Sequence, residues 1–229
     1  IATYVAAGTL DLGITGRDML ADSAVAADEI LALGFAPSTF RLAGPEGKYN
    51  AAQDLAGCRV ATSYPEILST YFDAIGVTAD VVRLDGAVEN AVRLGVADAV
   101  ADVVDTGATL RVAGLETIGE PIMHSEALLI RRTGAPASAE ADVFIRRLQG
   151  VLTARTYVLV DYDIPKDRVA DACALTPGLE SPTVSPLAED GWVAVRAVVP
   201  KTQVHRIMDR LADIGGRGIL VTAISACRL

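Results

Sequence analysis

Apolar and polar positions alternate in short blocks along the first 130 residues. Short apolar runs that end in turn residues predict buried strands at residues 10–15, 40–45, 58–62, 81–84, 99–104 and 127–130. Helical spacing of apolar residues predicts helices at residues 22–31, 50–56, 65–75, 85–94 and 140–154. Strands that alternate with helices through short turns are typical of parallel βαβ units, so the pattern predicts an α/β fold.

The pattern changes after residue 156. Apolar runs predict strands at residues 157–162, 183–187, 192–199 and 218–226. One helix is expected to begin near Pro165, and a second places Val204, Ile207 and Leu211 on a single face. The resulting order βαββαβ is that of a ferredoxin-like domain.

Residues 117–133 contain another apolar strand before the long helix at 140–154, and this strand is expected to lead the chain back to the first lobe. This return predicts that one lobe is inserted into another. We expect lobe I to comprise residues 1–40 and 120–155, lobe II residues 41–119, and a C-terminal domain residues 156–229. A ligand site would then lie in the cleft between the two lobes.

Composition narrows the classes of function. The chain has 229 residues, 51% of them hydrophobic, and a net charge of −9 without any run of Lys or Arg. Nucleic-acid binding requires a concentrated basic face, so a nucleic-acid partner is not expected. No apolar run approaches the roughly 18 residues of a membrane-spanning helix, so a membrane partner is not expected either.

Cysteine and histidine usage gives no metal site. Cys58, Cys173 and Cys227 are far apart and lie in apolar surroundings, which favours reduced thiols in a cytoplasmic protein. His124 and His205 have no partner at ligand spacing, so metal ligands remain unidentified.

The segment from Asp102 to Thr109 carries the clearest chemistry. A strand brings Asp102 to its carboxyl end, and a turn of Asp105-Thr106-Gly107-Ala108-Thr109 follows. Gly107 allows a close approach of the backbone to an anion, and successive amides and two threonine hydroxyls can donate to it. Acidic side chains would repel a phosphate but can accept from sugar hydroxyls, so the segment predicts a phosphorylated sugar as ligand. The alternative is an ordinary turn in which Asp105 caps the following helix.

Two further segments could contribute to this site. Glu89 lies near the start of the predicted helix at 85–94 and could face the same cleft. Alternatively, it is only an acidic first-turn residue that the helix dipole favours. Gly16-Arg17-Asp18 ends the first strand, where Arg17 could contact a phosphate and Asp18 an amino or hydroxyl group. This second segment also fits an ordinary turn.

Together these motifs resemble one enzyme family. GITGRD at 13–18, LDGAVE at 84–89, GVADAVAD at 95–102 with the adjoining Thr-Gly-Ala-Thr turn, and PGLESPT at 177–183 are similar to ATP phosphoribosyltransferase in its long form. The resemblance covers essentially the whole chain in the same order.

The resemblance implies a fold of two periplasmic-binding-protein-like (type II) lobes followed by a ferredoxin-like regulatory domain. It implies the first step of L-histidine biosynthesis: ATP and phosphoribosyl pyrophosphate give N1-(5-phosphoribosyl)-ATP and pyrophosphate, with Mg²⁺ as cofactor. It also implies self-association into dimers and hexamers and feedback inhibition by histidine.

The resemblance also assigns residues. The loop Asp105, Thr106, Gly107, Ala108 and Thr109 would bind the 5'-phosphate, and Glu89 and Asp102 would bind the ribose hydroxyls at the catalytic centre. Gly16, Arg17 and Asp18 would lie in the ATP pocket. Asp163, Thr183, Val198 and Gly218 would bind the allosteric histidine, although Asp163 could equally cap the helix that follows it.

The sequence departs from the family at its beginning. The family starts with a strand and a Lys-Gly loop, and has an arginine just before the position matched by Ile1. We therefore expect the 229-residue chain to bind histidine but to turn over poorly. Two alternatives remain: a two-lobed sensor without catalysis, and a tail that serves only in assembly.

Overall fold

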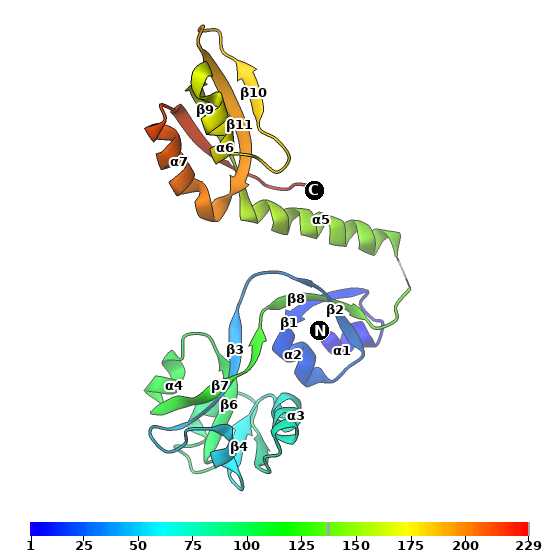
Figure 1. Ribbon diagram of the computed structural model, residues 1–229. Helices are drawn as coiled ribbons and strands as arrows, with labels where there is room; N and C mark the ends of the chain where they lie inside the picture. The colour runs from blue at the N-terminus through cyan, green and yellow to red at the C-terminus, as the bar shows by residue number, and fades with distance from the viewer. Residues whose placement is uncertain (137, 229) are drawn as a thin grey trace. The chain divides into compact units, whose positions relative to one another are not determined.

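A computed structural model describes residues 1–136 and 138–228 of the chain. They form two compact units, Ile1–Pro136 and Ala137–Leu229, each with its own core. Figure 1 shows the helices and strands of both. Across the described residues, every helix is too short or too polar to cross a membrane.

The first unit contains a small lobe built on a three-stranded sheet. Its strands are β1 (Leu12–Gly16), β8 (Ala127–Arg132) and β2 (Ala27–Ala32), paired antiparallel in the order β1-β8-β2. Helices α1 (Ala2–Ala6) and α2 (Arg17–Ser23) pack beside this sheet. We call this part lobe I.

The prediction of a helix at residues 22–31 is wrong. Helix α2 ends at Ser23, where Ala24 adopts a left-handed conformation with φ 49°. Residues 27–32 instead form β2 and hydrogen-bond to β8. Pairing with β8 overrides the helical preference of this alanine-rich segment, because local propensity is weak compared with tertiary pairing.

Lobe II is built on a five-stranded sheet in the order β5-β4-β6-β3-β7. Its strands are β3 (Ser38–Pro45), β4 (Arg59–Thr62), β5 (Asp80–Arg83), β6 (Ala99–Val104) and β7 (Leu115–Ser125). Its helical segments are η1 (Ala52–Leu55), α3 (Pro65–Ile75), η2 (Val88–Asn90) and α4 (Ala108–Val112). Strand β4 runs parallel to β5 and β6, as predicted, whereas β3 is antiparallel to its two neighbours.

The chain crosses between the lobes twice. Residues 33–37 lead from β2 to β3, and Glu126 alone separates β7 from β8. These crossings form a hinge in which the Ala127 amide donates to Phe35 O and the Leu33 amide to Ala127 O. The return crossing was expected at residue 120, but β7 remains paired with β3 through Ser125.

The second unit has the predicted order βαββαβ. After helix α5 (Ala139–Thr156), its elements are β9 (Tyr157–Pro165), η3 (Lys166–Arg168), α6 (Val169–Leu175), β10 (Thr183–Pro186), β11 (Trp192–Pro200), η4 (Lys201–Gln203), α7 (Val204–Asp213) and β12 (Arg217–Ala223). The sheet order is β10-β11-β9-β12. Helices α6 and α7 cover one face, where Ala172, Ile207 and Leu211 pack on buried strand residues.

Helix α5 was assigned to lobe I from the sequence, but it belongs to the second unit. The C-terminal segment packs on it: the Cys227 amide donates to Gly150 O at 3.1 Å. A Cβ atom at Gly150 would collide with Cys227 O, so this close approach requires glycine. The periodicity of α5 alone did not indicate which neighbour it would contact.

Candidate functional site

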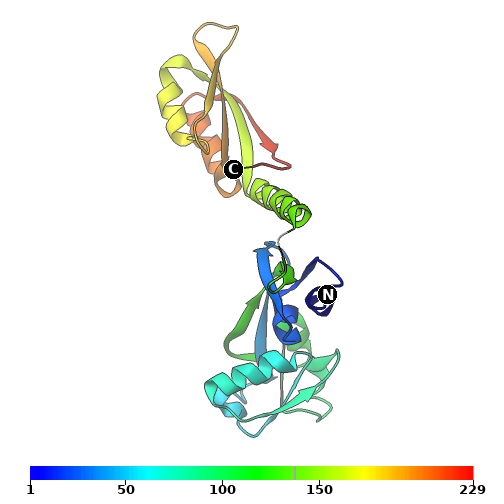
Figure 2. The same ribbon diagram turned by 90° about the vertical axis from the view of Figure 1, so that its right-hand side faces the viewer.

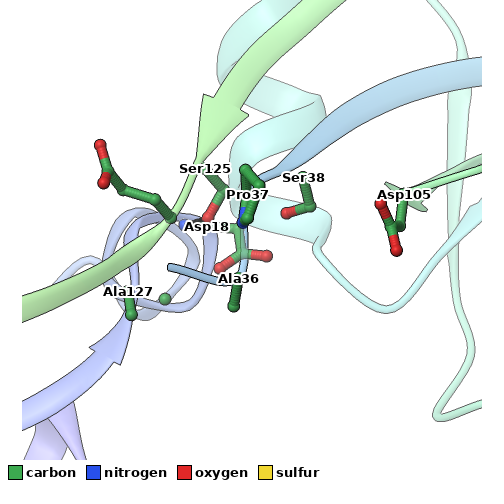
Figure 3. Close-up of a pocket in the computed structure, with 9 residues that line it drawn as sticks. Asp18, Ala36, Pro37, Ser38, Asp105, Ser125 and Ala127 are labelled. Atoms are coloured by element: carbon green, nitrogen blue, oxygen red, sulfur yellow. Dashed lines mark hydrogen bonds between the residues drawn. The ribbon is translucent and has the colours of Figure 1, made fainter. Parts of the chain in front are cut away.

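A cavity of about 360 Å³ opens at the hinge between the lobes. Gly16 and Asp18 line it from lobe I, and Asp105 lines it from lobe II. Figure 3 shows Asp18 close to Ser125 and Pro37, with Asp105 to one side. An adjoining cavity of about 490 Å³ shares Asp105 and adds Arg17. The structure therefore brings Asp105, the first residue of the predicted loop, to the cavities lined by the segment at 16–18.

Asp18 is held rigidly at the start of α2. It is 6% exposed, its amide donates to Ser125 Oγ at 3.1 Å, and the Met19 amide donates to its Oδ1 at 2.8 Å. A Cβ atom at Gly16 would collide with that same Oδ1, so only glycine leaves room for the carboxylate. Asp18 thus presents a fixed acceptor to the cavity.

Arg17 is paired within the protein. Its Nε and Nη2 donate to the two carboxylate oxygens of Glu29 at 3.1 and 2.8 Å, and Nη2 lies 3.4 Å from Glu126 Oε1. The hydrogen bond to Glu29 is the main reason that the pKa of Arg17 is raised. An arginine shared by two carboxylates offers little free charge to a phosphate. The phosphate contact considered for it from the sequence does not follow from this arrangement.

The loop after β6 exposes a row of backbone amides. Gly107 adopts φ 70° and ψ 13°, and α4 begins at the next residue. In the chain as described, the amides of residues 106–109 donate to no protein acceptor. Gly107, rather than Asp105, occupies the N-cap position, and no side chain caps α4. Consecutive free amides of this kind form a concave donor surface for an anion.

The carboxylates of Asp102 and Glu89 lie near the loop. Burial raises the pKa of Asp102, and the negative charge of Glu89 raises it further, while the Val103 amide, which donates to Asp102 Oδ1 at 2.8 Å, lowers it. Glu89 lines a cavity of about 280 Å³ together with Ala108 and Thr109. The predicted acids and the predicted loop therefore lie side by side.

The helix expected at residues 85–94 is much shorter in the structure. Only Val88–Asn90 form a single 3₁₀ turn, which follows Ala87 in a left-handed conformation with φ 49°. Val88 and Ala91 are nevertheless buried in the core of lobe II, as their spacing predicted. Burial of these two residues fixes Glu89 at the surface beside the loop.

Sequence reasoning missed the hinge residues Ser125 and Glu126. Glu126 accepts from the Gly34 amide at 3.0 Å and from Arg17, so its carboxylate joins both hinge crossings. Ser125 supports Asp18, as described above. Their only sequence signal is a pair of polar residues between two apolar strands.

Arg41 was also missed. It lies opposite Asp102 in the pairing of β3 with β6, so both side chains are on the same face of the sheet. Its guanidinium donates to Thr39 Oγ1 at 3.3 Å and to Gly119 O at 3.4 Å. A charged residue inside an otherwise apolar strand was the signal that could have identified it.

In the second unit, the four predicted histidine contacts lie on neighbouring strands. Asp163, Thr183 and Val198 occupy the sheet face opposite to α6 and α7, as their pairing registers show. Gly218 has φ 57°, and a Cβ atom there would lie 3.6 Å from Asp163 Oδ2. The structure thus brings Asp163 and Gly218 together, with Thr183 and Val198 further along the same face.

These features define a two-lobed α/β protein with a loop of free backbone amides after β6 and a separate ferredoxin-like domain. The predicted fold class is confirmed. The chain belongs to the ATP phosphoribosyltransferase family: a family model of that description matches residues 1–150, and the model described as "HisG, C-terminal domain" matches residues 154–226.

Individual relatives agree with this assignment. The chain is 62% identical to "ATP phosphoribosyltransferase" of Paenarthrobacter aurescens and 59% identical to that of Streptomyces coelicolor, covering 100% of this chain and 82% of each relative. It also resembles the solved "ATP phosphoribosyl transferase (HisG:HisZ) complex from Thermotoga maritima" at 26% identity and a TM-score of 0.60. That match covers 67% of this chain and 75% of the solved chain. The resemblance inferred from the motifs is confirmed.

Proposed function

We propose that this protein transfers the phosphoribosyl group of phosphoribosyl pyrophosphate to ATP, the first step of L-histidine biosynthesis. The observation that carries the proposal is the row of free amides at residues 106–109 directly after Asp102. Such a row suits a phosphate, and the adjacent acids suit sugar hydroxyls. Family membership supports the same reaction.

The reaction forms a bond between N1 of the adenine and the anomeric carbon of the ribose. The bond from that carbon to the pyrophosphate oxygen breaks, and the leaving group takes the electron pair. Residues 105–109 hold the 5'-phosphate, while Asp102 and Glu89 accept hydrogen bonds from the ribose hydroxyls. Positioning and electrostatic stabilisation of the cationic sugar supply the rate enhancement, so no side-chain nucleophile is required.

ATP would occupy the lobe I side of the cleft, at Gly16, Arg17 and Asp18. The fixed carboxylate of Asp18 is a suitable acceptor for an amino or hydroxyl group of the nucleotide. Arg17 acts indirectly, since its pairing with Glu29 and Glu126 orders the hinge that borders the pocket.

Mg²⁺ would enter with the pyrophosphate of the substrate. Among the described residues there is no group of three His, Cys, Asp or Glu side chains placed to hold an ion. Mg²⁺ commonly keeps several waters and binds through substrate phosphates and one or two carboxylates, a role open to Asp102 and Glu89. When bound, the ion supplies charge that stabilises the departing pyrophosphate.

Calorimetry with phosphoribosyl pyrophosphate and Mg²⁺ tests the proposal. We expect binding to the wild-type chain and about 10-fold weaker binding to Thr109→Ala, because a hydroxyl hydrogen bond to a charged phosphate is lost. Thr70→Ala, an exposed threonine on α3, is the matched control and should bind normally. Absence of binding by the wild-type chain, or equal binding by Thr109→Ala, would favour the non-catalytic sensor.

We further propose that histidine binds at Asp163 and regulates the enzyme. The carboxylate lies beside Gly218 on the uncovered sheet face and could pair with a cationic group of the amino acid. Histidine titration should show binding that falls at least about 10-fold in Asp163→Ala. Asp167→Ala, an exposed aspartate in η3, should leave the affinity unchanged. A tail that serves only in assembly would not bind histidine in either protein.

Cys58, Cys173 and Cys227 are all free thiols, which supports a cytoplasmic location. We propose that the protein self-associates into dimers and hexamers. Association within the family is supported by the related complex from Thermotoga maritima.

A further inference from the structure

A carboxylate of lobe I caps a helix of lobe II. Asp22 Oδ1 accepts from the amides of Glu66 and Ile67 at 2.9 and 3.3 Å. These amides belong to the first turn of α3, where no intrahelical partner exists. The N-cap residue Tyr64 makes no side-chain hydrogen bond to the helix, and Pro65 at the first position has no N–H. Helix α3 therefore depends on the other lobe for its cap.

The contact lies next to the cleft. Helix α2 carries both Asp22 and, one turn earlier, Asp18, which lines the cavity. Figures 1 and 2 both show α2 adjacent to α3. Charges from both lobes act on Tyr64, at the start of α3. Burial raises its pKa, and the negative charges of Asp18, Asp102 and Asp22 raise it further. The cap thus spans the two lobes beside the residues that line the site.

Besides this contact, the lobes are joined by the two hinge crossings at residues 33–37 and Glu126. Beside the hinge, the Asp18 amide also donates to Ser125 Oγ and Arg17 Nη1 to His124 O. Two lobes connected by a short hinge commonly open and close around a ligand. We propose that Asp22 is a positioning residue that stabilises the closed cleft by capping α3 across the lobes. Asp22 touches no reacting atom, so it acts on binding and not on the chemical step.

The expected effect follows from the strength of helix caps. Loss of such a cap typically changes an equilibrium about 2- to 30-fold. In Asp22→Ala, we expect the dissociation constant for phosphoribosyl pyrophosphate with Mg²⁺ to rise within this range. KM should rise similarly while kcat stays within about twofold of the wild-type value. The choice of ligand rests on the proposed function.

Two further variants separate the cap from general destabilisation. Asp22→Asn retains an oxygen that can accept from the same amides and should restore most of the affinity. Asp54→Ala is the matched control, because Asp54 accepts from the Asn50 and Ala51 amides at 2.8 and 3.1 Å but caps only within lobe II. It should lower the melting temperature without weakening binding.

The distance between the lobes gives a direct readout. Spin labels at the exposed Thr9 of lobe I and Thr70 of lobe II, with the three native cysteines replaced, should report longer distances in Asp22→Ala than in Asp54→Ala. Unchanged distances and affinity in Asp22→Ala would overturn the inference, as would an Asn variant as weak as the Ala variant. If the wild-type chain does not bind phosphoribosyl pyrophosphate, the proposed function fails, while the distances still test the cap.

Discussion

Gly107→Val should weaken binding of phosphoribosyl pyrophosphate by about 100-fold or more. The reason is that at least one strong, charge-assisted contact to the phosphate would be lost and the others would be misaligned. Gly107 has φ 70°, and a β-branched residue is a marked outlier there. A Cβ atom would also lie 3.3 Å from Arg111 Nη1, which donates to Thr106 O at 3.1 Å. The amides of residues 106–109 would therefore lose their common direction.

Gly57→Val is the control for backbone strain. Gly57 also lies in lobe II with φ 74°, but a Cβ atom there meets nothing within 4 Å. Both variants should lose stability, whereas only Gly107→Val should lose binding in calorimetry. Alanine would be a weaker test, because Ala24, Ala36 and Ala87 already adopt φ values of 49–51° in this chain. Normal affinity in folded Gly107→Val would remove the loop from the phosphate site.

Asp102→Asn should lower the affinity for phosphoribosyl pyrophosphate about 10- to 100-fold and yet keep or raise the melting temperature at neutral pH. The binding loss reflects replacement of a charged acceptor for a sugar hydroxyl. The stability gain has a different cause. Burial and the charge of Glu89 raise the pKa of Asp102 above its usual 3.8 in the folded chain.

A carboxyl group whose pKa is raised by folding contributes stability that is fully present below its unfolded pKa. That stability is lost as the pH rises through the folded pKa, so burying Asp102 costs more stability at neutral pH than in acid. The advantage of the Asn variant in thermal melts should therefore shrink as the pH falls toward about 4. A variant that is less stable at neutral pH and normal in binding would contradict the proposed role.

Asp98→Asn provides a comparison of opposite sign. The side chain and amide of Arg59 donate to Asp98 and lower the pKa of Asp98 to about 2. Its contribution to stability is present above the usual pKa and is lost as the pH falls through the lowered value. Asp98→Asn should be less stable than wild type at pH 7 and should bind phosphoribosyl pyrophosphate normally. Together the two variants separate a functional from a structural carboxylate.

Features encoded within short segments could be predicted from the sequence. The apolar strand at 99–104, the glycine after it and the following α4 define the loop through local geometry alone. The order βαββαβ likewise followed from periodicity, since Val204, Ile207 and Leu211 are buried on one face of α7. Strand alternation and helical spacing are properties of neighbouring residues, so they can be read before any tertiary contact is known.

The local sequence pattern did not predict the secondary structure of segments in which a helix competes with another conformation. Residues 22–31 favour a helix by composition, yet residues 27–32 form an edge strand because β8, about 100 positions later, offers a pairing partner. Residues 85–94 have a helical apolar spacing, yet only a 3₁₀ turn forms around the buried Val88. In both segments the outcome was decided by a partner that the segment itself does not contain.

The tertiary structure alone decided how the charged residues are used. Arg17 pairs with Glu29 and Glu126, and Asp22 caps α3 from the other lobe. Arg41 faces Asp102 only because β3 lies beside β6. The sequence by itself determined the loop, the domain type and the family. Contacts between residues separated by 12 to 109 positions depend on how strands and lobes are arranged in space, and that arrangement leaves no periodic signal along the chain.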